Sequence, residues 1–193
     1  VKPDLVDTVL AGLDLTAGQT LVTLGAAVSR SFVSARTDAT VVRVMPNLAA
    51  EFGEMAAAAT HEGLSEEVRT LLEAMGTVAK VDESLMDVAT AVNGSGPAFV
   101  FYLIDAVKTA GIEGGLDPTQ AERLAAQTFR GAAATVLRDD RTVDELVDAV
   151  CSPNGTTIEG MEVLWESDAD RAVADAVGAA ERRSREIAEA FEE

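Results

Sequence analysis

The sequence has one cysteine, Cys151, and one histidine, His61, among its 193 residues. A single cysteine cannot form an intrachain disulfide, so we expect a reducing, cytoplasmic environment. One residue of each kind also cannot supply the several histidine and cysteine ligands of a zinc site, which excludes that class of metal protein. We therefore expect no metal cofactor.

Long apolar runs are also missing from the sequence. No stretch approaches the roughly 20 apolar residues of a membrane-spanning helix, and no signal peptide is recognisable. The sequence therefore predicts no insertion into a membrane.

Positive charge is scarce. Lysine and arginine total 15 against 33 aspartates and glutamates, which gives a formal net charge of −18, and Lys2, Lys80 and Lys108 are the only lysines. Such a surface repels nucleic acids and anionic membranes, so we expect neither as a partner. Carboxylate-rich surfaces stay hydrated in concentrated salt, where repulsion between charges is screened. We therefore favour a salt-loving (halophilic) source over the alternative, an acidic protein from ordinary conditions.

The sequence is 48% hydrophobic, which is enough for a sizeable core in one or two domains. Toward the N-terminus, apolar residues at helical spacing alternate with short β-branched runs. The pattern predicts helices at 4–13 and 65–75 and strands at 20–24, 40–45, 55–60 and 77–81. This alternation favours a parallel, doubly wound α/β sheet.

From residue 83 onward the sequence predicts helices only. We therefore place a domain boundary near residue 90, between an α/β part, 1–90, and an all-α part, 91–193. The predicted helix starts are Ser95 or Gly96 with Pro97, Asp117 with Pro118, the capping box of Thr142 and Glu145, and Ile158. Residues 98–110 are apolar almost all round, so a small bundle could not bury this helix alone. A second copy of the chain could cover it, and we infer a homodimer.

One loop between two predicted helices is the strongest candidate site. It reads SPNGTTI, from Ser152 to Ile158. The simplest interpretation is that Thr156 or Thr157 caps the helix that begins at Ile158. The alternative is anion binding, because a helix start offers unpaired N–H groups and Gly155 lets a ligand approach the backbone. The hydroxyl groups of Ser152, Thr156 and Thr157 would add donors.

Three further segments are weaker candidates. NGSGPA (93–98) reads as a glycine-rich helix entry, and a tight packing turn explains it most simply. MPN (45–47) ends a predicted strand, where ligands bind in α/β sheets, although a strand terminator is the simpler explanation. Cys151 follows an apolar helical face and reads as an inert, buried thiol rather than a nucleophile.

Four segments together resemble the pyrroline-5-carboxylate reductase family: VKP at 1–3, RVMPN at 43–47, GSGPAF at 94–99 and SPNGTTIEGMEVLWE at 152–166. The likeness extends in order over nearly the whole chain. It implies a Rossmann-type domain (1–90) and a helical substrate-binding and dimerisation domain (91–193), in dimers that often assemble further into decamers. It also implies reduction of the C=N bond of 1-pyrroline-5-carboxylate to L-proline, a step of proline biosynthesis, with NADPH or NADH as cofactor.

The resemblance also implies roles for the matched residues. Lys2 and Pro3 would border the nucleotide, and Met45, Pro46 and Asn47 would lie beside the nicotinamide. Ser152, Gly155, Thr156 and Thr157 would bind the substrate carboxylate, and Thr157 matches the catalytic threonine that hydrogen-bonds the ring nitrogen. Hydride transfer to a protonated imine needs no acidic or histidine catalyst, because the nitrogen can take its proton from water.

The sequence departs from the family pattern at three places. The glycine-rich strand–turn–helix that precedes VKP in the family is not in this sequence, so we expect residues 1–90 to form an incomplete cofactor site. Leu48 and Ala49 stand where the family has Thr-Pro. Asn154 stands where the family has glycine, although asparagine tolerates unusual backbone angles better than most residues.

Two alternatives remain open on the sequence. Another imine-acting or β-hydroxyacid dehydrogenase would generally carry a catalytic lysine on the interdomain helix, whereas the helix after GSGPA has no lysine before Lys108. A non-enzymatic dimerising remnant would agree with the missing glycine-rich turn but not with the intact SPNGTTI.

Overall fold

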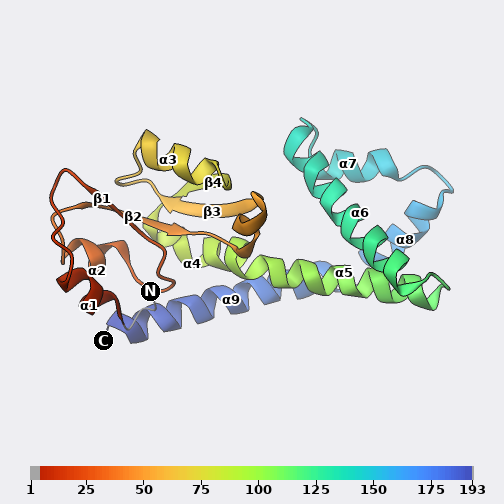
Figure 1. Cartoon of the computed structure of the whole chain (residues 1–193). Helices are drawn as coiled ribbons and strands as arrows, with labels where there is room; N and C mark the ends of the chain where they lie inside the picture. Colours follow the sequence, from red (N-terminus) through yellow and green to blue (C-terminus); the bar gives the residue numbers. More distant parts are fainter. Residues whose placement is uncertain (1–4, 193) are drawn as a thin grey trace. The chain divides into compact units, whose positions relative to one another are not determined.

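The computed structural model describes residues 5–192 of the chain (Figure 1). These residues form two compact units. One contains the described residues up to Pro97 together with those from Asp175 onward, and the other contains Ala98–Ala174. The sequence patterns predicted a boundary near residue 90, with the whole last helix in the second part. In the structure, the end of that helix, from Asp175 onward, belongs to the first unit.

The last helix, α9 (Ala169–Glu192), joins the first unit through two long-range contacts. The ring of Phe191 packs on that of Phe32, with centroids 4.8 Å apart. Ser184 Oγ donates a hydrogen bond to Asp87 Oδ1 (2.7 Å). Periodicity alone could not predict either contact, because each joins residues far apart in sequence.

Four strands form the sheet of the first unit, in the order β1-β2-β3-β4. They are β1 (Thr20–Thr23), β2 (Thr40–Met45), β3 (Met55–Thr60) and β4 (Gly76–Val81). All four lie where the sequence predicted strands. β3 is the least obvious of them, because its alanines favour helix. The ladder to β4 and the burial of Ala57, Ala58 and Ala59 outweigh that preference.

The sheet is mixed rather than wholly parallel. β1 pairs with β2, and β3 with β4, in parallel, but β2 and β3 are antiparallel, with Met45 opposite Ala58. The expectation of parallel strands is therefore wrong at this one pairing. The reason is the connection of residues 46–54, which holds only a short 3₁₀ helix, η2 (Leu48–Phe52). A parallel crossover needs about a dozen residues or more.

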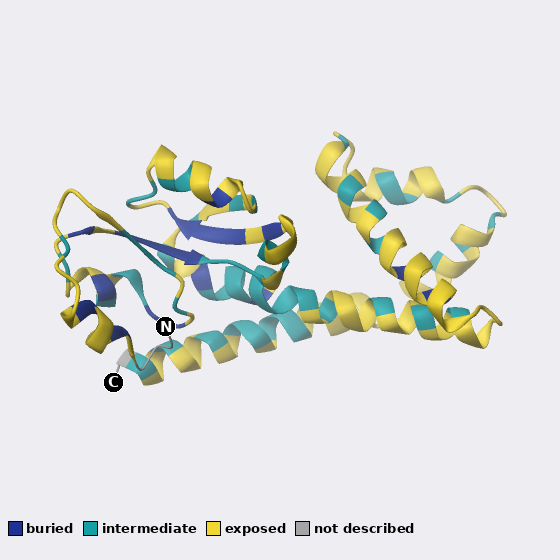
Figure 2. Ribbon diagram, in the orientation of Figure 1, coloured by how far each residue is buried: buried dark blue, intermediate teal, exposed yellow. Residues whose placement is uncertain are grey.

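The core of the first unit lies on both faces of β2, and Figure 2 draws much of β2 and β3 in the dark blue of buried residues. Val42 and Val44 pack on one face and Val41 on the other, as the alternation of a strand requires. The first cluster also contains Met55, Ala57, Ala59 and Leu72, and the second contains Val6, Leu10, Val28 and Val33.

Three short helices cover the sheet. α1 (Val6–Ala11) and α3 (Glu66–Glu73) confirm two predicted helices, and Ser65 Oγ caps α3 by accepting a hydrogen bond from the N–H of Val68 (3.3 Å). α2 (Arg30–Ser34) was not predicted, because five residues are too few to show a helical period.

One continuous helical path leads from the first unit into the second. It consists of α4 (Met86–Ala89), a π-helical segment η4 (Thr90–Ser95) and α5 (Gly96–Glu113). Pro97 lies in the first turn of α5, as predicted, but the expected cap at Ser95 or Gly96 is wrong, because η4 runs directly into this helix. Proline lacks the N–H that an α-helical ladder needs, and the wider π turns interrupt that ladder just before Pro97.

The second unit is helical, as predicted. It contains most of α5, then α6 (Pro118–Arg138), α7 (Val143–Val150), α8 (Thr156–Trp165) and the start of α9. Asp117 caps α6 by accepting from the N–H groups of Thr119 and Gln120 (2.9 and 3.3 Å). None of the helices within residues 5–192 is long and apolar enough to cross a membrane.

The predicted capping box of α7 is confirmed. Thr142 Oγ1 accepts from the N–H of Glu145 (3.3 Å), while Glu145 Oε2 accepts from the N–H (2.8 Å) and the hydroxyl (2.9 Å) of Thr142. These bonds, that from the backbone first, lower the pKa of Glu145 below its ordinary value of 4.5. The stabilisation is therefore present above pH 4.5 and is lost as the pH falls through the lower, folded-state pKa.

This capping box predicts a pH-dependent stability that Glu145→Gln should remove. The amide keeps the box but does not titrate, so the wild type should melt higher than the variant at pH 7, and the difference should shrink on acidification. Circular dichroism melts at several pH values in constant salt would measure it. Asp144→Asn is the control, because it neutralises the neighbouring acid in the same helical turn without touching the box. A difference that does not change with pH would contradict the prediction.

Candidate active site

The SPNGTTI segment forms a tight turn between α7 and α8. The N–H of Gly155 donates a hydrogen bond to the carbonyl oxygen of Ser152 (2.9 Å). Pro153 occupies the second position of this turn and Asn154 the third, with φ 57°. A proline followed by a positive φ is the arrangement of a type II turn, and asparagine accepts that φ better than most residues. The replacement of glycine by Asn154 therefore leaves the turn intact.

Gly155 is required by space rather than by its backbone angles, since its φ is −86°. A Cβ added to Gly155 would collide with Ser152 Oγ and lie 3.0 Å from the carbonyl oxygen of Ser152. Because Gly155 has no side chain, the Ser152 hydroxyl can lie beside the start of α8.

The start of α8 is not capped by a side chain. The helix begins at Thr156, and its N-cap is Gly155, which makes no side-chain cap bond. The expectation that Thr156 or Thr157 caps a helix starting at Ile158 is therefore wrong. Gly155 already has the extended conformation of an N-cap (ψ 167°), so both threonines lie in the first helical turn.

Donors are concentrated at this helix start. The first backbone N–H groups of a helix have no partner within the helix. Within residues 5–192, the hydroxyls of Ser152, Thr156 and Thr157 also make no hydrogen bond, and all three residues are exposed. Such a cluster can bind a carboxylate, to which the helix N-terminus adds its positive dipole end.

A second cluster of predicted residues lies in the first unit, where β2 ends at Met45. The side-chain amide of Asn93, from η4, donates to the carbonyl oxygens of Met45 (2.7 Å) and Ala56 (2.9 Å). Asn47 Oδ1 accepts from the N–H of Ala56 (3.2 Å). Side-chain amides thus replace the backbone ladder where Met45, Pro46 and Asn47 leave the sheet. β1 ends at the same edge, the one that binds ligands in α/β folds.

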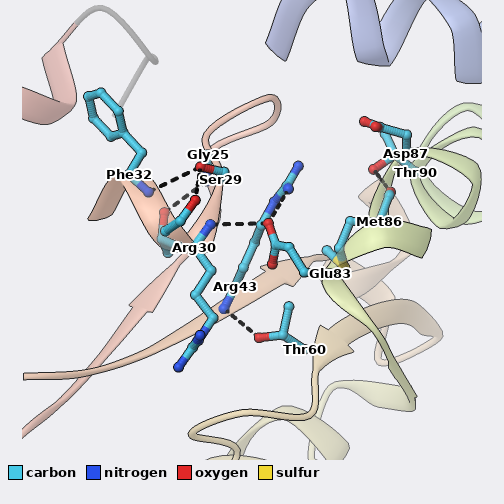
Figure 3. Close-up of polar contacts among 12 residues, drawn as sticks. Gly25, Ser29, Arg30, Phe32, Arg43, Thr60, Glu83, Met86, Asp87 and Thr90 are labelled. Carbon is cyan, nitrogen blue, oxygen red and sulfur yellow. Dashed lines mark hydrogen bonds and ion pairs between the residues drawn. The ribbon is translucent and has the colours of Figure 1, made fainter. Parts of the chain in front are cut away.

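An ion pair between the buried Arg43 and the half-buried Glu83 fixes β2 just before this edge (Figure 3). Arg43, only 6% exposed, places Nη1 2.7 Å from Glu83 Oε1, which also accepts from the N–H of Arg30 (3.1 Å). The N–H of Arg43 donates to Thr60 Oγ1 (3.1 Å) on β3. A buried charge needs such partners, because an unpaired one is costly to remove from water. The cluster therefore holds β2, β3 and the approach to α4 in register.

Comparison with known proteins identifies the family. Residues 83–187 match the family described as pyrroline-5-carboxylate reductase dimerisation. The chain is 40% identical over 196 residues to the pyrroline-5-carboxylate reductase of Methanosarcina acetivorans, covering 97% of this chain and 73% of that protein. The chain belongs to the pyrroline-5-carboxylate reductase family. Pyrroline-5-carboxylate reductase 1 of Bacillus subtilis is 35% identical and is covered over 68% of its length by this whole chain.

Solved structures of pyrroline-5-carboxylate reductases share the fold. The Coxiella burnetii enzyme superposes with a TM-score of 0.88 at 28% identity, covering 97% of this chain and 73% of that one. The Plasmodium falciparum enzyme, solved with NADP bound, gives a TM-score of 0.82 at 26% identity and covers 97% of this chain and 79% of that one. These similarities confirm the predicted fold class, a Rossmann-like part followed by the family's helical part.

The structure gathers the predicted residues into two groups. Ser152, Gly155, Thr156 and Thr157 share one turn in the second unit, and Met45, Pro46 and Asn47 share one sheet edge in the first. Lys2 and Pro3 lie outside the described residues. Cys151, predicted to be buried, is half-exposed at the end of α7. Among residues 5–192, no three histidine, cysteine, aspartate or glutamate residues form a group that could hold a metal ion.

Sequence reasoning missed Asn93 and the pair Arg43–Glu83. A signal was present for Arg43, because an arginine inside the apolar strand TVVRVM demands a buried partner. The partner itself could not be identified, since Glu83 lies 40 residues further along the chain. Asn93 was visible only as the first residue of a glycine-rich turn.

Proposed function

We propose that this protein reduces the C=N bond of 1-pyrroline-5-carboxylate to give L-proline, with NADPH or NADH as the hydride donor. The names of its relatives, pyrroline-5-carboxylate reductases, support this reaction. The observation that carries the proposal is the uncapped start of α8 with three free hydroxyls. It offers a small, carboxylate-bearing imine both an anion site and a hydrogen bond for its nitrogen. Oxidation of NADPH in the presence of 1-pyrroline-5-carboxylate, followed by absorbance, tests the proposal directly.

In this mechanism the helix start orients the substrate. The N–H groups of α8 and the Ser152 and Thr156 hydroxyls bind the carboxylate, and the Thr157 hydroxyl oxygen accepts a hydrogen bond from the N–H of the protonated ring nitrogen. The nitrogen takes its proton from water, which makes the adjacent carbon more electrophilic. Neither step requires a histidine or a carboxylic acid in the site.

The residues at the β2 edge fit a nicotinamide cofactor. Pro46 has no N–H, and the side-chain amides of Asn47 and Asn93 bond the backbone groups of Ala56, so the ladder between β2 and β3 does not continue beyond Met45. Met45, Pro46 and Asn47 would border the nicotinamide and Lys2 and Pro3 the nucleotide. When bound, the reduced cofactor supplies the hydride. A relative of known structure binds NADP, which supports this choice of cofactor class.

We also propose a cytoplasmic homodimer, with decamers as a further assembly of such dimers. In the second unit, Ala98–Ala174, Ala121 and Ala125 are the only buried residues. α5 exposes large apolar side chains, among them Phe101, Tyr102 and Val107. A second copy of the chain would cover them, and the match of residues 83–187 to the dimerisation family supports this assembly.

Thr157→Ala should lower turnover in the active enzyme more than Ser152→Ala does. The Thr157 hydroxyl is assigned to the reacting nitrogen, whereas Ser152 shares the carboxylate with several other donors. One such hydrogen bond contributes about 0.5–1.5 kcal/mol, and more when a charge takes part, so a loss of about tenfold is expected. Steady-state kinetics measure it. Unchanged turnover in Thr157→Ala would remove this residue from the mechanism.

A further inference from the structure

The side-chain amide of Asn93 is the strongest feature to which the proposed mechanism gives no role. Its Nδ2 donates to Met45 O (2.7 Å) at the end of β2 and to Ala56 O (2.9 Å) near the start of β3. Asn47 Oδ1 accepts from the N–H of the same Ala56 (3.2 Å). Both polar backbone groups of Ala56 are therefore bonded to asparagine side chains.

The partners fix the orientation of the Asn93 amide. Both are carbonyl oxygens, which only accept hydrogen bonds, so only the NH₂ end of the amide fits between them. Oδ1 must then point elsewhere, and it is buried without a hydrogen-bond partner among the described residues. A buried acceptor without a partner is unfavourable. The two donor bonds are therefore the reason for an amide at this position.

Two donors are needed because β2 and β3 separate here. Their antiparallel pairing runs only to Met45 opposite Ala58, and Pro46 has no N–H to extend it. Asn93 reaches both strands from the π-helical segment η4, a kind of segment that recurs at functional sites. The amide thus sets the direction in which Met45, Pro46 and Asn47 leave the sheet.

We propose that Asn93 is a positioning residue for hydride transfer, which holds Met45, Pro46 and Asn47 in the geometry that seats the nicotinamide. The inference rests on the proposed function, in which these three residues border that ring. Asn93 acts through the backbone of Met45 and Ala56 and does not touch the reacting atoms.

Three substitutions of Asn93 test this role. Asn93→Ser keeps one donor, Asn93→Leu keeps the size without a donor, and Asn93→Asp keeps the shape but sets a carboxylate against two carbonyl oxygens. We expect kcat to fall in that order, from about 5-fold to more than about 100-fold. The Kd of NADPH, measured by nicotinamide fluorescence, should rise in the same order. The KM for 1-pyrroline-5-carboxylate should stay within about twofold, because its carboxylate site lies on α8.

The control is Thr90→Val in the same segment, which removes the hydrogen bond from Thr90 Oγ1 to Met86 O (2.7 Å). It should leave the Kd of NADPH unchanged. A merely structural role for Asn93 would reduce the folded fraction and hence the apparent kcat, without changing the Kd of the folded molecules. The split between Kd and KM therefore separates the two roles.

The outcomes are distinct. A folded Asn93→Asp variant with the wild-type Kd and kcat overturns the inference and leaves the proposed function in place. Should Asn93→Asp not fold, a wild-type Kd in both Asn93→Ser and Asn93→Leu overturns it equally. A wild-type enzyme that binds NADPH or NADH but reduces no imine with it overturns the proposed function, and the inference with it.

Discussion

Transfer of the protein from molar salt to about 10 mM salt should dissociate the dimer and unfold its helical unit. Each chain carries a net charge of −18, so association brings two strongly acidic surfaces together. The Debye length is about 30 Å at 0.01 M and about 3 Å at 1 M, so the repulsion crosses the assembly only at low salt. Salting-out ions also strengthen apolar burial. The expected cause is therefore a halophilic adaptation of the surface, which we propose from the charge balance.

The helical unit should be the part most affected. Its only buried residues are Ala121 and Ala125, whereas the first unit has two apolar clusters around β2. In the proposed dimer, the helical unit would complete its core with the partner's surface, whereas the first unit has a core of its own. Light scattering across a salt series measures the mass, and circular dichroism on the same samples measures the helix content.

Single charges placed on the surface give a matched pair of variants for this test. Phe101→Asp, on the exposed apolar side of α5 (58% exposed), should give a monomer even at high salt. Leu71→Asp, on α3 of the first unit (67% exposed), adds the same charge away from α5 and should remain dimeric. A stable wild-type monomer at molar salt would contradict the dimer. A dimer that persists at low salt would contradict only the halophilic interpretation.

Strand positions could be predicted because they depend on local pattern, whereas strand direction depends on the connections. TVVRVM and TVAKV are β-branched runs bounded by turns, and both are strands. β2 and β3 are antiparallel because only residues 46–54 connect them. The alternation of predicted strands and helices takes no account of the length of a connection, so it could not predict this direction. The π-helical turns of η4 have no periodic signature, and NGSGP reads instead as a helix start.

The candidate site also has local features, which the sequence predicted, and long-range contacts, which it did not. The donors of SPNGTTI are consecutive in sequence, so their grouping on α8 could be predicted, and only the position of the cap was wrong. Asn93 and Met45 meet across 48 residues, and their hydrogen bond exists only once the sheet has formed. Such contacts are set by tertiary packing, which a single sequence does not display.

Gly155→Ala should be the most damaging single substitution in the proposed substrate site. The added Cβ would collide with Ser152 Oγ and lie 3.0 Å from the carbonyl oxygen of Ser152. The hydroxyl must rotate away from the start of α8, and the turn bond from Gly155 N to Ser152 O (2.9 Å) must lengthen. Hydrogen bonds to a charged group contribute about 1.5–3 kcal/mol each, so losing one should lower kcat/KM by roughly 10- to 150-fold. Most of that loss should appear in the KM for 1-pyrroline-5-carboxylate, with little change in the Kd of NADPH.

Gly160→Ala is the matched control for this substitution, because it adds the same methyl group to the same helix. A Cβ at Gly160 meets nothing within 4 Å, so this variant should keep wild-type kinetics and gain up to about 1 kcal/mol of helix stability. The double variant Ser152→Ala/Gly155→Ala gives a further test. Both substitutions act through the same hydroxyl, so their effects on kcat/KM should not add. Strict additivity, or a folded Gly155→Ala variant with the wild-type KM, would show that Ser152 does not bind the substrate over this helix start.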